Sequence, residues 1–195
     1  MNVGIMGGTF DPIHIGHLIA ADRAREEAGL DEVWFMPSGV PPHKTGDGIT
    51  AAEDRLEMVR LAIGSHPAFQ LNNYEIKRGN VSYTIDTVRW LREHHPEHRF
   101  FWIIGADMIE YLPKWYQIDE LLKLISFIGL KRPGYESALE ELPENIRASV
   151  RMIEAPLMEI SSTELRERLA NGHSVKYTLP QAVESYIKEH HLFHS

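Results

Sequence analysis

Two glycines and two histidines stand close together near the start of the chain, in NVGIMGGTFDPIHIGH (residues 2–17). Gly7 and Gly8 directly follow an apolar run, and residues this small let backbone amides approach an anionic ligand closely. His14 and His17 are three residues apart, so on a helix they would share one face. Two imidazoles there could donate hydrogen bonds to phosphoryl oxygens and stabilise charge that develops when a phosphorus atom is attacked. The segment therefore indicates a phosphate site.

The spacing of these residues differs from two common phosphate-binding loops. No Lys-Ser or Lys-Thr pair follows the glycines, as it would in a Walker A loop. The glycines also lack the G-x-G-x-x-G spacing, so a dinucleotide site for hydride transfer is not expected. A tight turn with a capping Asp11 and two surface histidines is the alternative. The complete string after a first strand favours the phosphate interpretation over that alternative.

A second motif, ISSTELR (residues 160–166), precedes another predicted helix. Glu164 stands at the capping-box position relative to the first serine. Arg166 lies on the first turn, where its forked guanidinium could reach phosphate oxygens. An ordinary capped helix with a solvated arginine is the alternative. Hydroxyl groups and free amides at a helix start can hold phosphate, and the hydroxyls here are those of Ser161, Ser162 and Thr163.

Together these motifs resemble the two signatures of the nucleotidyltransferase superfamily. GGTFDPIHIGH resembles the first signature, whose H-x-G-H element is shared with class I aminoacyl-tRNA synthetases, and ISSTELR resembles the second. Further elements follow in order between them, namely SYT (residues 82–84), GAD (105–107) and KWY (114–116). With these elements the whole chain is similar to the bacterial nicotinate mononucleotide adenylyltransferases.

The resemblance implies adenylyl transfer from ATP to nicotinate mononucleotide, which gives nicotinate adenine dinucleotide and pyrophosphate in NAD biosynthesis. It implies four catalytic residues, His14, His17, Lys44 and Arg166. The expected ATP-binding residues are Gly7, Gly8, Thr9, Phe10, Gly105, Asp107, Ile160, Ser161, Ser162 and Thr163. The expected nicotinate mononucleotide-binding residues are Tyr83, Thr84 and Trp115. In this assignment Trp115 stacks on the pyridine ring, and Thr84 with nearby amides recognises the ring carboxylate.

Lys44 lies in PPHKTG, within the Gly/Pro-rich stretch 38–49. A single lysine on a loop is usually solvated. In the context of the superfamily, we expect the stretch to act as an active-site flap and Lys44 to close over the substrate phosphates.

A direct in-line transfer is expected. The chain has no cysteine, and no serine has a recognisable base with an orienting partner, so a covalent intermediate is unsupported. Mg²⁺ is expected to enter with ATP, bound by phosphate oxygens and water. The sequence shows no carboxylate cage for the ion, and no metal-binding residues are assigned.

Several alternatives stay open on the sequence. The acceptor could be nicotinamide mononucleotide or phosphopantetheine, although Trp115 and the SYT element argue against phosphopantetheine. A non-catalytic nucleotide sensor could keep the glycines, but it would not need both histidines. The 11 histidines raise the possibility of a metal-binding protein. Those near the C-terminus, His190, His191 and His194, have no carboxylate or cysteine partner nearby and are interpreted as a solvated terminus.

The elements that must position these residues alternate between strand-like and helix-like segments. Apolar strands are expected at 3–6, 33–36, 69–73, 100–105, 125–130 and 151–155. Amphipathic helices are expected at 15–28, 51–64, from 84 to about 95, 162–171 and 180–190, with a capping box from Thr50 to Glu53. This alternation is typical of an α/β, Rossmann-like doubly wound parallel sheet with helices on both faces. Ligands bind such sheets beyond the carboxyl ends of the strands, where most motifs fall. A single nucleotidyltransferase domain, 1–195, is expected, with a C-terminal helical portion from about 162.

Composition narrows the class further. The chain has 195 residues and a formal net charge of −8, which argues against binding to nucleic acid. Its apolar runs are too short to span a membrane, and no signal peptide is recognisable. A cytoplasmic enzyme is expected, and apolar surface on the last helices could support a homodimer.

Overall fold

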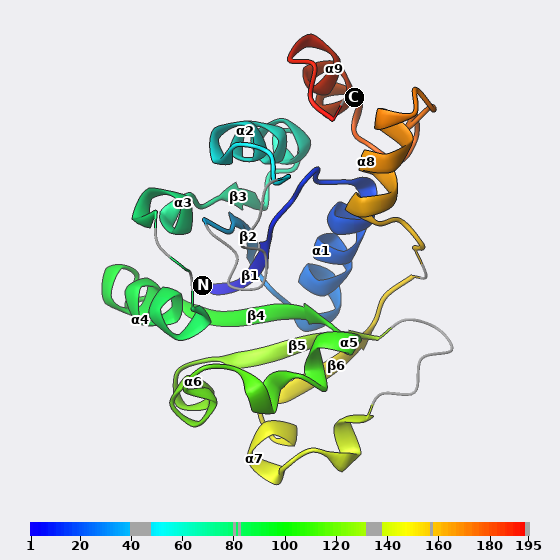
Figure 1. Cartoon of the computed structure of the whole chain (residues 1–195). Helices are drawn as coiled ribbons and strands as arrows, with labels where there is room; N and C mark the ends of the chain where they lie inside the picture. The colour runs from blue at the N-terminus through cyan, green and yellow to red at the C-terminus, as the bar shows by residue number, and fades with distance from the viewer. Residues whose placement is uncertain (40–47, 80, 82, 132–137, 157, 194–195) are drawn as a thin grey trace.

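Six parallel strands form the centre of the computed structural model, in the order β3-β2-β1-β4-β5-β6 (Figure 1). The structure describes residues 1–39, 48–79, 81, 83–131, 138–156 and 158–193. The strands are β1 (Asn2–Gly8), β2 (Glu32–Pro37), β3 (Phe69–Leu71), β4 (Arg99–Gly105), β5 (Ser126–Lys131) and β6 (Val150–Glu154). This architecture confirms the α/β, Rossmann-like expectation.

The order of the strands creates a switch point beside β1. The chain runs from β1 outward to β2 and β3 on one side, and then crosses back to place β4 on the other side of β1. Connections from β1 and β4 therefore diverge at the carboxyl ends of these two strands. In open parallel sheets, such a divergence leaves a crevice in which ligands bind.

Helices cover both faces of the sheet and bury two separate apolar clusters. The first cluster joins β1 and β2 to α1 (Ile15–Ala28), α2 (Ala52–Ile63), α8 (Ser162–Ala170) and α9 (Gln181–Glu189). The second cluster lies on the opposite face, under α4 (Thr84–His94), α6 (Ile118–Leu124) and α7 (Glu144–Arg147). The remaining short helices are α3 (Tyr74–Arg78), α5 (Ala106–Ile109), η1 (Leu112–Lys114) and η2 (Ala138–Glu141). Because β1 and β4 are covered on both sides, their sequences are apolar almost throughout.

The end of α1 illustrates how the local sequence sets an element boundary. Gly29 has φ 68°, a left-handed conformation that side chains disfavour, and its N–H donates to the carbonyls of Arg25 and Glu26. Leu30 then donates to the carbonyl of Arg25 as well. The chain thus turns sharply out of α1 into β2, and the start of α1 stays at the carboxyl edge of the sheet.

Several local predictions were wrong. The capping box from Thr50 to Glu53 does not form, because the N-cap of α2 is Ala51 and no side chain caps the helix. The Thr50 N–H instead donates to Asp11 Oδ2 at 3.3 Å. The alternative interpretation of the first motif, with Asp11 as a helix cap, is excluded because His14 is the N-cap of α1.

Two segments around the third strand also differ from the prediction. β3 ends at Leu71, two residues earlier than expected. α3 forms at Tyr74–Arg78, between the strand expected at 69–73 and the helix expected from 84, and it ends at Gly79 with φ 70°. A five-residue helix carries too little periodicity to be recognised from its sequence.

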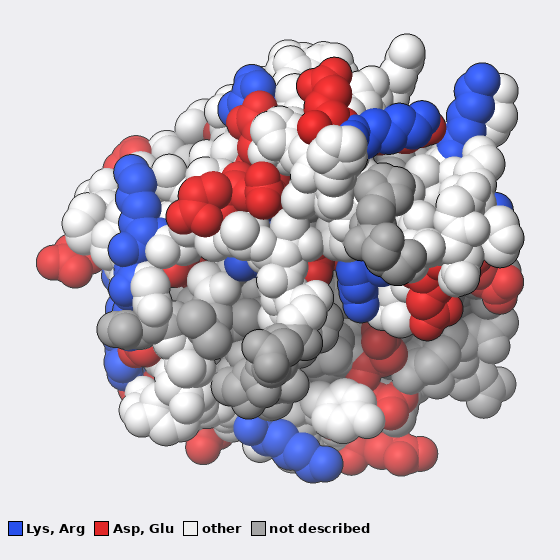
Figure 2. Space-filling view, turned by 45° about the horizontal axis from the view of Figure 1, so that its top comes forward, with Lys and Arg blue, Asp and Glu red and all other residues white. Residues whose placement is uncertain are grey.

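The surface carries mixed charge on the side seen in Figure 2, where lysine and arginine side chains alternate with aspartate and glutamate. Among the residues that the structure describes, that side presents no broad basic surface of the kind that nucleic-acid binding uses. A search of the described residues found no helix of the length and apolarity that crossing a bilayer requires.

Candidate active site

Two adjoining cavities open where the connections of β1 and β4 diverge. The larger has a volume of about 630 Å³ and is lined by Met6, Gly7, Gly8, Thr9, His14, Gly16, His17, Ala20, Ser38, Trp102, Ile103, Ile104, Gly105, Met108, Trp115, Leu130, Ala155, Met158 and Ile160. The smaller, about 380 Å³, is lined by Gly7, Gly8, Ser38, Glu75, Tyr83, Thr84, Trp102, Met108, Lys114, Trp115 and Tyr116. Because they share six lining residues, the two cavities form one two-part cleft.

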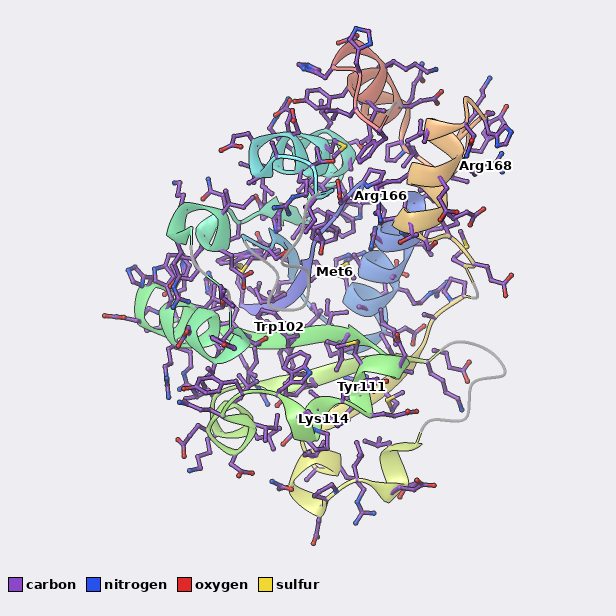
Figure 3. The ribbon with its side chains drawn as sticks, in the orientation of Figure 1. Met6, Trp102, Tyr111, Lys114, Arg166 and Arg168 are labelled. Atoms are coloured by element: carbon purple, nitrogen blue, oxygen red, sulfur yellow. The ribbon has the colours of Figure 1, made fainter. Side chains whose placement is uncertain are left out.

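Figure 3 shows the segments that surround this cleft. Met6 and Trp102 come from the neighbouring strands β1 and β4. Arg166 projects from α8 on one side, whereas Tyr111 and Lys114 come from the segment after α5 on the other side. Residues more than 100 positions apart in the sequence thus lie around the same cleft, among them His14 and Ile160, which both line the larger cavity.

The turn after β1 is shaped by its glycines. A Cβ on Gly7 would lie 3.0 Å from the indole ring of Trp102, and one on Gly8 would lie 3.0 Å from the ring of Phe10. Both distances are tighter than ordinary van der Waals contact, so only glycine leaves the backbone free to line the cleft. The turn therefore brings its backbone close to the cleft, and the binding of a ligand by its amides stays a prediction.

His14 and His17 lie ring against ring at the start of α1. Their centroids are 3.7 Å apart with an interplanar angle of 25°. The backbone N–H of His14 donates to His17 Nδ1 at 3.2 Å. A neutral imidazole that accepts at Nδ1 carries its proton on Nε2. The hydrogen that His17 can offer to a ligand is therefore that of Nε2.

Burial keeps both imidazoles neutral. Desolvation lowers the pKa of His14 to about 4, and desolvation together with the charge of His14 lowers the pKa of His17 to about 3. At neutral pH each ring is then a hydrogen-bond donor without a net charge. Such a donor can stabilise negative charge on a phosphoryl oxygen through its N–H, which stays on the ring.

Phe10 supports the histidines from behind. It is only 2% exposed and has φ 51°, a conformation that is uncommon for a residue with a side chain. Its ring meets that of His17 edge-on at 5.1 Å, and it also packs against Phe35 at 5.9 Å. Phe10 is thus part of the apolar cluster and contacts the cleft through His17.

The second motif meets the first through hydrogen bonds. Ser162 Oγ donates to the carbonyl of Pro12 at 2.9 Å, and Arg166 donates to the carbonyl of Asp11 at 2.8 Å. Ser161 Oγ accepts from the Glu164 N–H at 3.1 Å, which caps α8 as predicted. These contacts fix the start of α8 against the turn that carries the histidines, and both motifs therefore belong to the same site.

The start of α5 carries the GAD element. Gly105 is the N-cap of α5, and a Cβ there would lie 2.5 Å from Asp107 Oδ1. The carboxylate of Asp107 therefore folds back over Gly105, while most of the side chain is exposed to solvent. This places a hydrogen-bond acceptor at the rim of the larger cavity.

The smaller cavity has four aromatic residues in its lining, Tyr83, Trp102, Trp115 and Tyr116. Trp115 packs edge-on against Phe127 at 5.8 Å, which holds its indole in place at the junction of the two cavities. Tyr83 and Tyr116 lie 4.7 Å apart. Thr84 is the first residue of α4, and the first amides of a helix have no partner within the helix. The cavity thus combines an aromatic wall with hydrogen-bond donors.

The structure brings most of the sequence-predicted site residues to the cleft. Those that line it are Gly7, Gly8, Thr9, His14, His17, Gly105, Ile160, Tyr83, Thr84 and Trp115. Six others lie beside the cleft or behind its wall, namely Phe10, Asp107, Ser161, Ser162, Thr163 and Arg166. Lys44 lies outside the described residues.

Sequence reasoning missed several residues that line the cleft. Ser38 lines both cavities, and its buried hydroxyl has no hydrogen-bond partner among the described residues. Trp102 and Met108 also line both cavities, and Lys114 lines the smaller one. Trp102 could have been suspected from its place in the strand that ends at Gly105. Ser38 and Met108 carry no sequence signal of this kind.

Arg55 was also missed, although it joins three segments behind the site. It is 1% exposed and donates to the carbonyls of Thr9 at 2.8 Å, Gly39 at 3.2 Å and Thr50 at 3.1 Å. The guanidinium thus ties the turn after β1 to both sides of the stretch 38–49. An arginine within an amphipathic helix pattern is normally exposed, so its sequence gave no reason to select it.

No group of three acidic or histidine side chains able to hold a metal ion lies in the cleft as far as the residues are described. His14 and His17 are the titratable residues of the larger cavity's lining. The cleft offers neutral donors, backbone amides and aromatic surface, which suits a nucleotide more than a bare metal ion.

Comparison with known proteins agrees with this geometry. The cytidylyltransferase-like family model matches residues 5–168. The nicotinate-nucleotide adenylyltransferase of Bacillus subtilis is 48% identical over 193 residues, covering 99% of this chain and 98% of its own. A probable nicotinate-nucleotide adenylyltransferase of Oceanobacillus iheyensis is 49% identical, covering 98% and 96%.

Solved structures share the fold. A Plasmodium falciparum nicotinic acid mononucleotide adenylyltransferase complexed with NaAD superposes with a TM-score of 0.79 at 22% identity, covering 98% of this chain and 97% of that one. The matched residues 5–168 include both motifs and the whole cleft described above. The chain therefore belongs to the cytidylyltransferase-like family and, within it, to the bacterial nicotinate-nucleotide adenylyltransferases.

Proposed function

We propose that the chain transfers the adenylyl group of ATP to nicotinate mononucleotide, with release of pyrophosphate. The observation that carries the proposal is the two-part cleft, in which neutral histidine donors stand beside an aromatic cavity. The near-half sequence identity to nicotinate-nucleotide adenylyltransferases along the full chain supports the same reaction.

In the proposed arrangement ATP occupies the larger cavity. Its triphosphate lies against the amides after β1, the imidazoles of His14 and His17, and the start of α8 with Arg166. The adenosine lies towards Gly105 and Asp107, where a carboxylate can accept bonds from ribose hydroxyls. Ile160 supplies apolar surface on the α8 side. Two more residues, Thr9 and Phe10, complete this part of the site. The hydroxyl groups of residues 161–163 hold the start of α8 in place.

Nicotinate mononucleotide occupies the smaller cavity. Trp115 provides a flat face for the pyridine ring. The ring carboxylate points to the start of α4 at Tyr83 and Thr84, where free amides and the helix dipole favour an anion. Lys114 lines the same cavity and adds positive charge. These donors favour the acid over the neutral amide of nicotinamide mononucleotide.

The chemistry needs no covalent intermediate. A 5′-phosphate oxygen of the acceptor attacks the α-phosphorus of ATP, and the bond from that phosphorus to the β-phosphate oxygen breaks. The Nε2–H of His17 donates to the charge that develops, and His14 orders His17 through its backbone N–H. Magnesium enters as part of the MgATP substrate, held by phosphate oxygens and water. Lys44 is proposed to close over the same phosphates.

The decisive test measures pyrophosphate release with MgATP and each of three acceptors: nicotinate mononucleotide, nicotinamide mononucleotide and phosphopantetheine. We expect the highest kcat/KM with nicotinate mononucleotide. A higher value with phosphopantetheine would overturn the proposal. In parallel, Trp115→Ala should raise the KM for the pyridine nucleotide more than the KM for ATP, because the proposed stacking is on the pyridine ring, although Trp115 also lines the ATP cavity.

We also propose where the enzyme acts and whether it assembles into a dimer. One domain over 1–195 is proposed to act in the cytoplasm, where both nucleotides are available, and a homodimer through the last helices stays a prediction. Sedimentation velocity over a range of protein concentrations would distinguish a dimer from a monomer.

A further inference from the structure

A cluster of two histidines and a glutamate lies at the opposite end of β4 from the cleft. His95, Glu97 and His98 form it, between the end of α4 and the start of β4. One possible ligand atom from each of the three side chains lies within 4.8 Å of the other two. Two imidazoles and a carboxylate are a ligand set that divalent transition metals such as Zn²⁺ accept.

A tight turn gathers these side chains. The His98 N–H donates to the carbonyl of His95 at 3.1 Å, which closes a turn with Pro96 and Glu97 at its centre. The two imidazole rings lie nearly parallel, 5.8 Å apart with an interplanar angle of 9°. Glu97 Oε1 lies 3.2 Å from His98 Nε2. The turn therefore presents all three groups on the same side.

The packing around the turn fixes both rings before any ligand binds. Trp34 contacts His95 edge-on at 5.0 Å and His98 edge-on at 5.9 Å. The indole N–H of Trp34 is itself bound to Glu32 at 2.8 Å. The side chain of His98 is only 11% exposed, whereas that of Glu97 is 60% exposed and can rotate. Two ligands are thus held in place and the third is adjustable.

One ring nitrogen of His98 makes no hydrogen bond to the described residues. Its Nδ1 atom is buried and has no hydrogen-bond partner among the described residues. A buried polar atom in this state calls for a physical explanation, and an ion at the ring is one of them.

The electrostatics beside the cluster are mixed. The cluster follows the C-terminal end of α4, where the partial negative charge of the helix dipole favours positive charge. Three cationic side chains, Arg92, Arg99 and Lys123, line the pocket that His98 also lines, and a bound cation would lie near them. Each has another contact: Arg99 lies over the ring of Phe101 at 5.2 Å, Arg92 donates to the carbonyl of Leu124 at 3.0 Å, and Lys123 donates to Glu120 at 2.7 Å.

We propose that His95, Glu97 and His98 bind a divalent transition-metal ion of the Zn²⁺ class, with a remaining position for water. Such an ion would link the end of α4 to the start of β4. β4 spans seven residues, or about 20 Å at the usual rise per residue, so the ion would not touch the reacting phosphates. The site is therefore structural, and it is separate from the proposed reaction.

The test measures Zn²⁺ binding to the full chain by equilibrium dialysis, and quenching of tryptophan fluorescence by Co²⁺ or Ni²⁺. We expect one equivalent of tightly bound zinc and a higher melting temperature with zinc. Trp34 and Trp90 both contact the ring of His95, at 5.0 and 5.8 Å, so Trp34→Phe should reduce the quenching and the double variant Trp34→Phe/Trp90→Phe should largely remove it. Glu97→Gln and His98→Gln should each weaken zinc binding by about 100-fold. Because Glu97 is exposed, its variant keeps the fold even where the His98 variant does not.

Matched controls separate this site from the other histidines. His94→Gln alters the neighbouring imidazole, which contacts the Trp90 carbonyl and not the cluster, and it should bind zinc like the wild type. The double variant His190→Gln/His191→Gln should do the same. Zinc binding that survives Glu97→Gln and His98→Gln, or that disappears in the His190/His191 variant, would refute the proposal. Adenylyl transfer should be equal in wild type and Glu97→Gln, so the outcome does not depend on the proposed reaction.

Discussion

At the scale of single residues, the proposed reaction relies on two imidazoles, those of His14 and His17, that are hydrogen-bond donors without charge. The backbone N–H of His14 occupies Nδ1 of His17, so the tautomer is set by the helix start and not by the ligand. Phe10 fixes the orientation of the same ring from the apolar side. The geometry is thereby complete before a nucleotide arrives, which is how pre-organised donors lower a barrier.

Replacement of His17 tests this role. We expect His17→Ala to lower kcat by about 10²–10³, the usual cost of losing one such donor, with a smaller effect on the KM for nicotinate mononucleotide. Steady-state kinetics with both substrates measure it. His173→Ala, at an exposed position outside the cleft, is the matched control and should leave kcat unchanged. Turnover of His17→Ala within twofold of wild type would remove the residue from the mechanism.

The same burial makes stability depend on pH. The pKa values of His14 and His17 are lowered to about 4 and about 3 from an ordinary 6.5, so between these values the unfolded chain binds protons that the native chain does not. The contribution of these neutral imidazoles to the free energy of unfolding therefore has its full value above about pH 6.5, and it falls as the pH drops towards 4. Each ring adds at most about 1.4 kcal/mol per pH unit to this slope.

Urea unfolding at several pH values measures the effect. We expect the free energy of unfolding to fall between pH 6.5 and 4, and the fall to be shallower in His17→Gln. An equal slope in the two proteins would mean that His17 is not the group that takes up the proton.

At the scale of elements, α2 and α8 hold the turn after β1 from two directions. Ser162 and Arg166 of α8 bond to the carbonyls of Pro12 and Asp11. Arg55 of α2 bonds to the carbonyl of Thr9 and to the two sides of the stretch 38–49. The turn after β1 is therefore positioned by helices that come from distant parts of the sequence.

Arg55 is the sharpest test of this arrangement. We expect Arg55→Met to lower the free energy of unfolding by about 3 kcal/mol, because three part-buried carbonyls lose their charged donor. We also expect it to raise the KM for ATP. Arg60→Met is the matched control on the same helix, since Arg60 is exposed and bonds only to Glu57 within the described contacts. Equal unfolding midpoints for the two variants would contradict the proposed role of Arg55.

Sequence motifs predicted the ends of helices and strands well where a residue contacts others that are close to it in the sequence. Ser161 caps α8 as its spacing with Glu164 indicated, and the glycines after β1 leave the expected space. The signals failed where a distant residue competes. Thr50 has the spacing of a capping residue, but its N–H is taken by Asp11, which lies 39 positions earlier. Arg55, Ser38 and Met108 reached the site only through the fold, and no local pattern records such contacts.

At the scale of the whole molecule, the cleft joins segments from both halves of the chain. His14 and Ile160 line the same cavity as Gly105 and Trp115. A nucleotide that bridges these segments binds the native chain and not the unfolded one, and it must therefore stabilise the protein.

Thermal unfolding with MgATP tests this consequence. At a nucleotide concentration 100 times the Kd, we expect a gain of about 2.7 kcal/mol and a corresponding rise in melting temperature. Nicotinate mononucleotide should add a further rise, and Trp115→Ala should lose that second rise but keep the first. A variant that loses both rises together would show that the two cavities do not bind the two nucleotides separately.

The apolar cluster on the α1 face has a consequence for how the protein is made. It combines residues of β1 and α2 with Val183 and Ile187 of α9, which lie far downstream in the sequence. During translation, which adds about 5–20 residues per second, this face of the nascent chain stays uncovered until α9 has been synthesised, and it is there that a chaperone would find apolar surface. A chain released before α8 would also lack the hydrogen bonds by which Ser162 and Arg166 hold the turn after β1.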